Sequence, residues 1–403
     1  MKKVLFVLCG FPIGGIETYI LRLTKELNGR GISVDILLLS EKYDFGLMNE
    51  VRNYANILIC ERTFLSNGSS WINAFLPHKS VTETQYYDVV HVIDLLTLGF
   101  VLLNADTIKF KSLSIGIYHS MEICWWRDKN AYFRQKLLEI YDKNVELTLF
   151  PNESTATIAS NYTGKNVDSF NIVPLGIDLI KYNKSAPSFR SKRIISVGRL
   201  VDFKVYNRHM ISQLAAIRKL AHLEYYIYGD GPEKESLYLH AVACGVEKFV
   251  HFEGSVAYET LQDIFNDSFC FIGSGTTIIE ASAAGIPSIV GIESILEPLT
   301  CGFFCDISGY SYNELSATTT RISFIDAISK LIGFTAIEYQ TFSAAHRKKA
   351  SSFDIKITTT AFLEKSTATP NFSTPLNRWR ALLSFGFSML RFGPKALKSR
   401  MHQ

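Results

Sequence analysis

The sequence predicts an α/β protein built from two Rossmann-like domains, and three observations carry the prediction. Apolar strand-like runs alternate with helical segments across glycine-rich turns, which is the pattern of βαβ units and parallel sheets. This series starts twice, once at the N-terminus and once near residue 192. The chain has 403 residues, which is more than one ordinary core supports.

The first forty residues carry the first βαβ unit. The buried-strand run KKVLFVL leads through the turn CGFPIGG into a helix whose apolar residues recur at helical spacing from Ile16 to Leu27. SVDILLLS is the next strand. Further strand-like runs, each with a helical segment or turn after it, complete the first half: DVVHVID, KSLSIGIYH, NVELTLFP and FNIVPLGID.

The second series begins at KRIISVGRL, after a polar, proline-containing stretch that suits a linker. It continues through four more strand-like runs: LEYYIYGDG, FVHFEGSV, SFCFIGSG and IPSIVG. SFDIKITTTAFLEK predicts a terminal helix, and STATPNFSTPLN after it is a Ser/Thr/Pro-rich linker. The expected organisation is therefore two domains at 1–183 and 184–345, a crossover helix at 346–365 and a tail at 366–403.

Charge, cysteine content and apolar runs argue against several classes of protein. The net charge of +4 is small for this length and does not indicate a nucleic-acid-binding protein. The seven cysteines are scattered without a CxxC pair, as expected of reduced, cytosolic thiols. The N-terminal MKKVLFVLCGF has a short apolar run and no small-residue cleavage site, so we expect a folded strand rather than a signal peptide. With no run of 18 apolar residues, no membrane span is expected.

Four glycine-containing turns are candidates for substrate binding. Gly14 and Gly15 precede the first helix, whose N–H groups and dipole suit a phosphate or sugar, although the spacing is not G-x-G-x-x-G. A simple tight turn is the alternative. In VGRLVDFK, Arg199 and Lys204 follow the strand end at Gly198, where two cations suit a diphosphate; two solvated charges are the alternative.

The remaining turns lie later in the second series. In YIYGDGPEKESL, Gly229 is explained mostly as a strand-to-helix turn. The stretch FIGSGTTIIEASAAGIPSIVG places Gly273, Ser274, Gly275 and Thr276 before a helix-like segment that contains a single acid. That acid, Glu280, is either a ligand for hydroxyl groups or an acid stabilised by a helix N-terminus.

Taken in order, these motifs resemble the retaining glycosyltransferases of family 4, also called group 1, over residues 1–365. The segments that carry the resemblance are GGIETYILRL, VGRLVDFK, YGDGPEKESL, HFEGSV and GSGTTIIEASAAGIPSIVG. The resemblance implies the GT-B architecture, in which two Rossmann-like domains face each other across a cleft. It also implies a nucleotide-sugar-dependent glycosyltransferase of the hexosyltransferase type, with the donor on the C-terminal domain and the acceptor on the N-terminal one.

The resemblance also implies roles for single residues. Arg199 and Lys204 match the pair that neutralises the diphosphate, and Glu280 matches the acid that binds the ribose hydroxyls. His119, at the end of SIGIYHS, matches a histidine that faces the donor sugar and acceptor; a structural histidine is the alternative. The full expected donor-binding set is Gly14, Gly15, Gly198, Gly229, Gly273, Ser274, Gly275, Thr276 and Glu280. The catalytic set is His119, Arg199 and Lys204, with no metal and no cofactor expected, since the nucleotide-sugar is a substrate.

One position departs from the family pattern. The pattern E-x7-E would place its first Glu, which contacts the donor sugar, at Ile272, and isoleucine accepts no hydrogen bond. Three explanations stay open: an altered donor, another carboxylate, or a slow or inactive protein.

The C-terminal tail has its own pattern. Residues 366–403 contain six basic residues and no acid, so the rest of the chain carries a net charge of −2. Apolar residues fall at helical spacing between the arginines: Leu376, Trp379, Leu383, Phe387 and Leu390. A basic amphipathic helix predicts contact of residues 376–400 with an anionic membrane surface. A helix packed on the domain and a disordered tail are the alternatives.

The sequence thus predicts a retaining glycosyltransferase in surface polysaccharide biosynthesis, using a UDP- or GDP-sugar and a glycan or lipid-linked acceptor. We expect it to be cytoplasmic and peripheral on the inner face of the cell membrane. Two rival functions are a catalytically degenerate nucleotide-sugar-binding partner subunit and a sugar-nucleotide epimerase. Donor sugar, acceptor, linkage and oligomeric state have no signature in the sequence.

Overall fold

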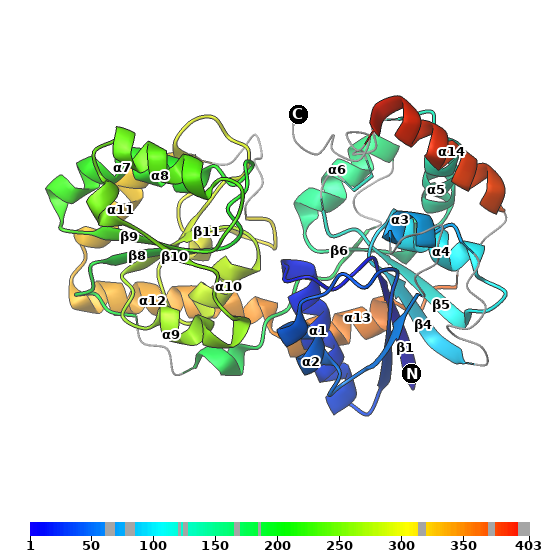
Figure 1. Ribbon diagram of the computed structural model, residues 1–403. Helices are drawn as coiled ribbons and strands as arrows, with labels where there is room; N and C mark the ends of the chain where they lie inside the picture. Colours follow the sequence, from blue (N-terminus) through cyan, green and yellow to red (C-terminus); the bar gives the residue numbers. More distant parts are fainter. Residues whose placement is uncertain are drawn as a thin grey trace. The chain divides into compact units, whose positions relative to one another are not determined.

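The computed structural model describes residues 1–60, 69–76, 85–119, 122–123, 128–164, 170–183, 187–312, 320–369 and 375–393. The chain forms two compact units (Figure 1). The first unit comprises Met1–Gly176 and Ile355–Gln403, and the second comprises Ile177–Asp354. The unit boundary thus follows Gly176, whereas the sequence suggested a boundary after residue 183.

The first unit is built on a parallel sheet of seven strands in the order β3-β2-β1-β4-β5-β6-β7. The strands are β1 Lys3–Leu8, β2 Ser33–Leu38, β3 Asn56–Ile59, β4 Tyr86–Val92, β5 Lys109–Gly116, β6 Thr148–Phe150 and β7 Asn171–Ile172. The order reverses between β1 and β4, as in a doubly wound Rossmann fold.

Helices cover both faces of this sheet, because the strands are apolar on both faces. Leu5 and Val7 of β1 pack into one core cluster, and Val4, Phe6 and Leu8 pack into the other. The helices of the first unit are α1 Gly15–Gly29, α2 Phe45–Val51, α3 Ser70–Asn73, α4 Leu95–Leu103, α5 Tyr132–Lys143, α6 Glu153–Thr163, α13 Ile355–Lys365 and α14 Arg378–Phe392. The result is a three-layer α/β/α unit.

The end of the chain belongs to the first unit. Helix α13 packs beside α1, with Ile355 and Phe362 in the same core cluster as the α1 side chains, and α14 packs beside α5 (Figure 1). The single helix expected at 346–365 is divided: its first residues end α12 in the second unit, and a 3₁₀ turn at Ser351–Phe353 precedes α13.

The second unit contains a parallel sheet of five strands in the order β10-β9-β8-β11-β12. Its strands are β8 Arg193–Val197, β9 Glu224–Tyr228, β10 Val250–Gly254, β11 Cys270–Gly273 and β12 Ser288–Val290, with a separate antiparallel pair of β13 Leu299–Thr300 and β14 Ile322–Ser323. Its helices are α7 Tyr206–Leu220, α8 Lys234–Ala243, α9 Leu261–Phe265, α10 Thr276–Ala283, α11 Phe324–Ile332 and α12 Ala336–Ala350.

The two faces of the second sheet are also both apolar. Ile194, Cys270 and Ile272 pack with α7 and α11, whereas Ile195 and Phe271 pack on the face of α10. Alternate residues of each strand therefore enter opposite cores, as the pleat of a β-strand requires.

Candidate active site

The sheet order fixes where a ligand site belongs in the second unit. Strands β8 and β11 are neighbours in space but not in sequence, so the strand order reverses between them. In open parallel sheets, ligands bind outside the carboxyl ends of the strands at such a switch point. The loop at Gly198 follows β8 and the loop at Ser274 follows β11, and both were expected from the sequence to bind the donor.

The turns after β8 and β9 approach each other closely at two glycines. Gly198 and Gly229 have φ angles of 154° and 146°. A Cβ at Gly229 would overlap the carbonyl oxygen of Gly198. Both the backbone conformation and the space therefore require glycine here. The turns at Gly198 and Gly229 therefore lie against each other at the carboxyl edge of the second sheet.

Of the two predicted cations, Lys204 points to this edge. Its Nζ lies 3.2 Å from the place that a Cβ of Gly198 would take, and the side chain is half-buried. Arg199 is exposed. The ring of Tyr206 completes the surroundings, because a Cβ at Gly291 would meet it at 2.5 Å. Tyr206 was not expected from the sequence.

The loop after β11 presents the N-terminus of α10. Gly275 precedes the helix with φ 66° and has open space where a Cβ would be. The hydroxyl of Thr277 donates to the carbonyl of Val197 at 3.1 Å, which ties the first turn of α10 to the end of β8. Tyr312 donates to the carbonyl of Gly275 at 3.0 Å. Gly273, Ser274, Gly275 and Thr276 therefore stand where helix N–H groups attract an anion.

Glu280 lies deeper than the sequence implied. It is 1% exposed, and the hydroxyl of Tyr258 donates to its Oε1 at 3.2 Å. Tyr258 is held in turn by Lys181, whose Nζ donates to the Tyr258 carbonyl and lies 3.6 Å from the ring centroid. A ribose hydroxyl that bound this oxygen would have to compete with the tyrosine hydroxyl.

Ile272 does not face the site. It is 0% exposed, pairs with Ile289 of β12 and belongs to the core cluster on the α7 face. A carboxylate at this position would be buried among apolar side chains. The first position of the E-x7-E pattern that ends at Glu280 therefore lies in the core, because β11 continues up to Gly273.

The carboxyl edge does hold another acid, Glu293, which the sequence analysis missed. It follows β12 directly, and Ser274 Oγ donates to its Oε1 at 2.7 Å. The signal that could have revealed it is its place at the end of a parallel strand, since such ends share one edge of the sheet.

The first unit has an equivalent switch point between β1 and β4. Gly14 forms the N-cap of α1, and its carbonyl accepts hydrogen bonds from Thr18 N and Oγ1 at 3.0 and 2.9 Å. The carboxylate of Glu17 occupies the place where a Cβ of Gly14 would be. An acid beside this turn disfavours an anion and leaves Gly14 and Gly15 better suited to neutral hydroxyl groups.

His119 follows β5 on a turn fixed by its neighbours. Tyr118 packs edge to face on Tyr19 of α1 at 5.8 Å and accepts or donates a hydrogen bond with His91 Nε2 at 2.8 Å. His119 itself is exposed, and its carbonyl accepts from Glu122 N at 2.9 Å. The structure thus places His119 in the first unit, on a turn anchored against the helix that follows Gly15.

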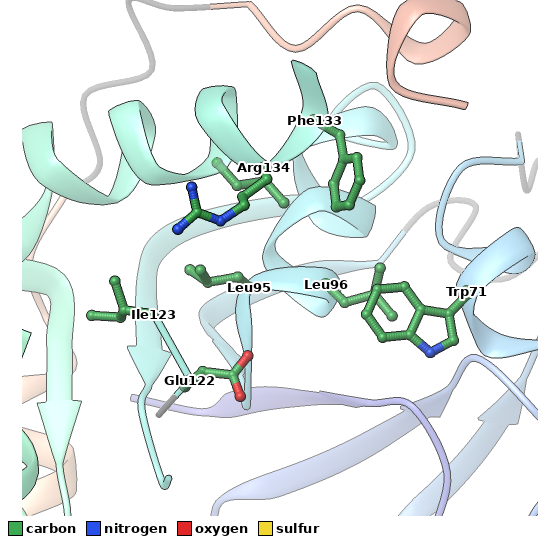
Figure 2. A pocket seen from close by; sticks show the side chains of 8 residues that line it. Trp71, Leu95, Leu96, Glu122, Ile123, Phe133 and Arg134 are labelled. Atoms are coloured by element: carbon green, nitrogen blue, oxygen red, sulfur yellow. The ribbon is translucent and has the colours of Figure 1, made fainter. Parts of the chain in front are cut away.

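A small pocket lies beside this turn (Figure 2). Its volume of about 30 Å³ is room for about two water molecules. The walls are mainly apolar, and the carboxylate of Glu122 and the guanidinium of Arg134 are the charged groups that line it. Both residues are more than nine-tenths buried. Burial, and then the nearby Asp94 and Glu122, raise the pKa of the Cys9 thiol, so this cysteine stays neutral.

Helix α14 carries a second candidate surface. Ala381 and Phe385 lie on its buried side. The ring of Phe385 stacks on the ring of Trp71, with centroids 5.7 Å apart. Its exposed apolar face is formed by Trp379, Leu383, Phe387 and Leu390, which are 66%, 62%, 69% and 85% exposed. Arg380 and Arg391 are exposed on the same helix, whereas Lys395, Lys398 and Arg400 lie outside the described residues.

No helix in the described part of the chain is long and apolar enough to cross a membrane. Among the same residues, no group of three or more His, Cys, Asp or Glu side chains is arranged to hold a metal ion.

Comparison with known proteins agrees with this architecture. Residues 13–181 match the family model described as Glycosyltransferase Family 4, and residues 181–316 match the model described as Glycosyl transferases group 1. A curated relative is EpsF of Bacillus subtilis (strain 168), named as a candidate glycosyltransferase. It is 23% identical over 334 residues, covering 75% of this chain and 82% of that protein.

Solved structures share the fold across almost the whole chain. The lipopolysaccharide outer core galactosyltransferase WaaB has 16% identity and a TM-score of 0.59, covering 90% of this chain and 99% of its own. Anabaena HepE in complex with UDP and glucose has 13% identity and a TM-score of 0.61, with the same coverage. S. aureus TarM, solved with UDP and alpha-GlcNAc-glycerol, has 10% identity and a TM-score of 0.66, covering 91% and 100%.

Proposed function

Because the chain belongs to the glycosyltransferases of family 4, with a group 1 domain in its second half and the GT-B fold, we propose that it is a retaining hexosyltransferase. It would move a sugar from a nucleotide-sugar to a glycan or lipid-linked acceptor. One observation carries the proposal. At the β8/β11 switch point, Lys204 and the N-terminus of α10 converge on the same carboxyl edge.

The leaving group explains why a cation and a helix N-terminus belong together. When the bond between the sugar and the phosphate breaks, a nucleoside diphosphate departs and its terminal phosphate gains negative charge. Lys204 and the N–H groups at Gly275 and Thr276 stabilise that charge before and during bond breaking. Arg199, exposed on the same loop, adds a second cation. We propose that these groups serve in place of a metal ion.

The transfer step needs a proton acceptor as well as a leaving group. The acceptor oxygen forms a bond to the anomeric carbon, the bond from that carbon to the phosphate oxygen breaks, and the acceptor proton passes to the departing phosphate. We assign His119 to orient the reacting hydroxyl groups, as the family resemblance implies. Attack and departure on the same face of the sugar would give retention.

UDP is the first nucleotide to test. Two of the similar solved proteins, HepE and TarM, were crystallised with UDP, and HepE also with glucose. The Glu280 carboxylate would bind the ribose hydroxyls, as two acceptor oxygens suit a vicinal diol. In the first unit, the turn at Gly14 would contribute to acceptor binding. WaaB, a lipopolysaccharide outer core galactosyltransferase, supports the proposal of a role in surface polysaccharide biosynthesis.

The acceptor would be reached at a membrane surface. The exposed apolar face of α14 offers four large side chains to lipid, and the segment around it contains arginines and no acid. Anionic lipid headgroups complement this charge, and Trp and Phe suit the interfacial region. We therefore place the protein in the cytoplasm, peripheral on the inner face of the cell membrane.

A donor screen on the purified protein tests the function. UDP-, GDP- and ADP-sugars are incubated with membrane lipid extract as acceptor, and release of nucleoside diphosphate is followed alongside binding. We expect release with one donor and loss of release in Lys204→Ala. Tight binding without release would instead favour a degenerate partner subunit. Absence of binding to any nucleotide would contradict the donor site.

A further inference from the structure

Glu293 occupies a defined place at the carboxyl edge of the second sheet. Gly291 N donates to the carbonyl of Gly273 at 2.8 Å, so the chain after β12 runs beside the glycine loop after β11. Two residues later, the carboxylate of Glu293 accepts the hydroxyl of Ser274 at 2.7 Å. The Glu293 carboxylate is therefore held against the loop that precedes α10.

The backbone next to Glu293 is held in a costly conformation. Ser294 has φ 59°, a left-handed conformation that costs a non-glycine residue about 1–2 kcal/mol. Its N–H donates to the carbonyl of Phe203 at 2.8 Å, in the loop that carries Lys204. This bond joins the loop after β12 to the loop after β8, so Glu293 lies between the loop of Lys204 and the loop of Ser274.

The chemistry of a carboxylate at this place suits a sugar rather than a phosphate. Ser274 binds one oxygen, and Oε2 has no hydrogen-bond partner among the described residues. A carboxylate repels a diphosphate but accepts strong hydrogen bonds from hydroxyl groups. It also stabilises the positive charge that develops on a sugar ring as the glycosidic bond breaks.

Two other acids of this unit, Glu280 and Asp230, are less suited to the role. Glu280 is buried and accepts the hydroxyl of Tyr258, and Asp230 accepts the N–H of Gly231 at 2.8 Å within its own turn. Position 272 is in the core. Glu293 is half-buried rather than enclosed in the core, and Ser274 holds its carboxylate.

We propose that Glu293 binds the hydroxyl groups of the transferred sugar, and that Ser274 positions its carboxylate. This assignment rests on the proposed transferase function and supplies the sugar-binding acid that position 272 lacks. A charge-assisted hydrogen bond to a hydroxyl group should contribute a factor of about 10 to 100 to the affinity for the nucleotide-sugar and nothing to the affinity for the nucleoside diphosphate.

The test compares affinities, so that it does not depend on turnover. Dissociation constants are measured by titration calorimetry for UDP, GDP and ADP and for the corresponding nucleotide-hexoses. The variants are Glu293→Ala, Glu293→Gln and Ser274→Ala, with Glu297→Ala, an exposed acid four residues further along the chain, as the matched control. Thermal unfolding of each variant is recorded in parallel.

We expect Glu293→Ala to weaken the nucleotide-hexose about 10- to 100-fold and the nucleoside diphosphate less than threefold, with Glu293→Gln in between and Glu297→Ala unchanged. Equal losses for both ligands, or no loss for either, would overturn the assignment even if the wild type transfers sugar. If the wild type binds no nucleotide at all, the proposed function fails and this assignment fails with it.

Discussion

At the residue scale, the buried position of Glu280 has a consequence for nucleotide binding. The Tyr258 hydroxyl already donates to Glu280, so a ribose hydroxyl must displace that bond. Replacing Tyr258 by Phe removes the competitor and keeps the ring that Lys181 contacts. We expect Tyr258→Phe to tighten nucleoside diphosphate binding about two- to tenfold. Glu280→Gln should weaken it by at least a similar factor, and both are measured by titration calorimetry.

The second sheet offers a matched control for this change. Tyr226 donates to Glu224 Oε2 at 3.1 Å, a tyrosine–glutamate bond remote from the β8/β11 switch point. Tyr226→Phe should leave nucleotide affinity unchanged. If Glu280→Gln binds the nucleotide as tightly as the wild type does, the ribose assignment is wrong.

Lys204 and Arg199 are expected to differ in importance because the structure exposes them differently. Lys204 is half-buried against Gly198, whereas Arg199 is exposed and screened by solvent. We predict a loss of transfer of about 10²- to 10³-fold in Lys204→Ala and of about tenfold in Arg199→Ala. Steady-state release of nucleoside diphosphate measures both, with the exposed Lys219→Ala as control. A larger loss in Arg199→Ala would reverse the assignment.

The sequence indicated the glycine turns and Lys204 because strand ends and glycine turns are local patterns, and the structure places Gly198, Gly229 and Lys204 at the carboxyl edge of the second sheet. Their roles in donor binding stay predictions. The sequence indicated neither Glu293 nor Tyr206, because both reach the edge through the order of strands in the sheet. The first position of the E-x7-E pattern falls on Ile272, whose side chain lies in the core. Since β11 extends to Gly273, the register of the strand decides which side chains face the core.

At the element scale, the close approach of the β8 and β9 turns predicts a specific sensitivity. In Gly229→Ala, the new Cβ would overlap the carbonyl oxygen of Gly198 and the backbone φ of 146° would also be strained. We expect a loss of about 3 kcal/mol or more in the free energy of unfolding of the second unit. Denaturant unfolding measures this loss.

Gly245 is a control position at which an added Cβ would cause backbone strain but no steric overlap. Its φ is 67°, and a Cβ there would meet nothing within 4 Å. Gly245→Ala should therefore cost only the left-handed strain, about 1–2 kcal/mol. If the two variants are equally destabilised, the close approach of the two turns contributes nothing to stability.

Polar substitutions on the exposed apolar face of helix α14 should weaken membrane binding and leave the fold intact. Leu383→Gln with Phe387→Gln removes two exposed side chains that contact little of the protein, so stability should hold. Binding to vesicles of phosphatidylcholine and phosphatidylglycerol should fall at least tenfold. Sedimentation with vesicles measures this, and high salt should weaken the wild type as well.

A matched control exists on α8, where Leu239 and Val242 are 59% and 46% exposed. Leu239→Gln with Val242→Gln should not change vesicle binding. Equal losses in the two double variants, or wild-type binding that is equally strong without anionic lipid, would contradict the assignment to α14.

The α/β class and the parallel sheets follow from the sequence because strands buried on both faces are continuous apolar runs. Every strand expected from such a run is present: β1, β2 and β4 to β12. β3, β13 and β14 were not expected, since they are short and half-buried for the most part and therefore lack that signal. The return of α13 to the first unit depends on packing against α1, which local pattern does not encode.

At the scale of the whole molecule, the described part of each unit contains one fully buried, neutral histidine. His91 is 0% exposed and bonds to Ser114 Oγ and Tyr118 OH, both at 2.8 Å. His346 is also 0% exposed, and its Nε2 accepts the N–H of Ser288 at 2.9 Å. Burial lowers the pKa of His91 to about 3 and that of His346 to about 4. Acid should therefore destabilise both units.

The sign and size follow from proton linkage. An unfolded histidine binds a proton below about pH 6.5, whereas these two stay neutral in the folded state until pH falls to about 4 or 3. Their contribution to stability is complete above pH 6.5 and is lost as pH falls toward those values. From pH 8 to pH 5 each histidine should cost about 2 kcal/mol. Urea unfolding measures the free energy of unfolding at each pH. Its slope against pH should be smaller by nearly one proton in His91→Gln and in His346→Gln. The exposed His222→Gln should keep the wild-type slope. An unchanged slope in both buried variants would mean that other groups govern the acid sensitivity.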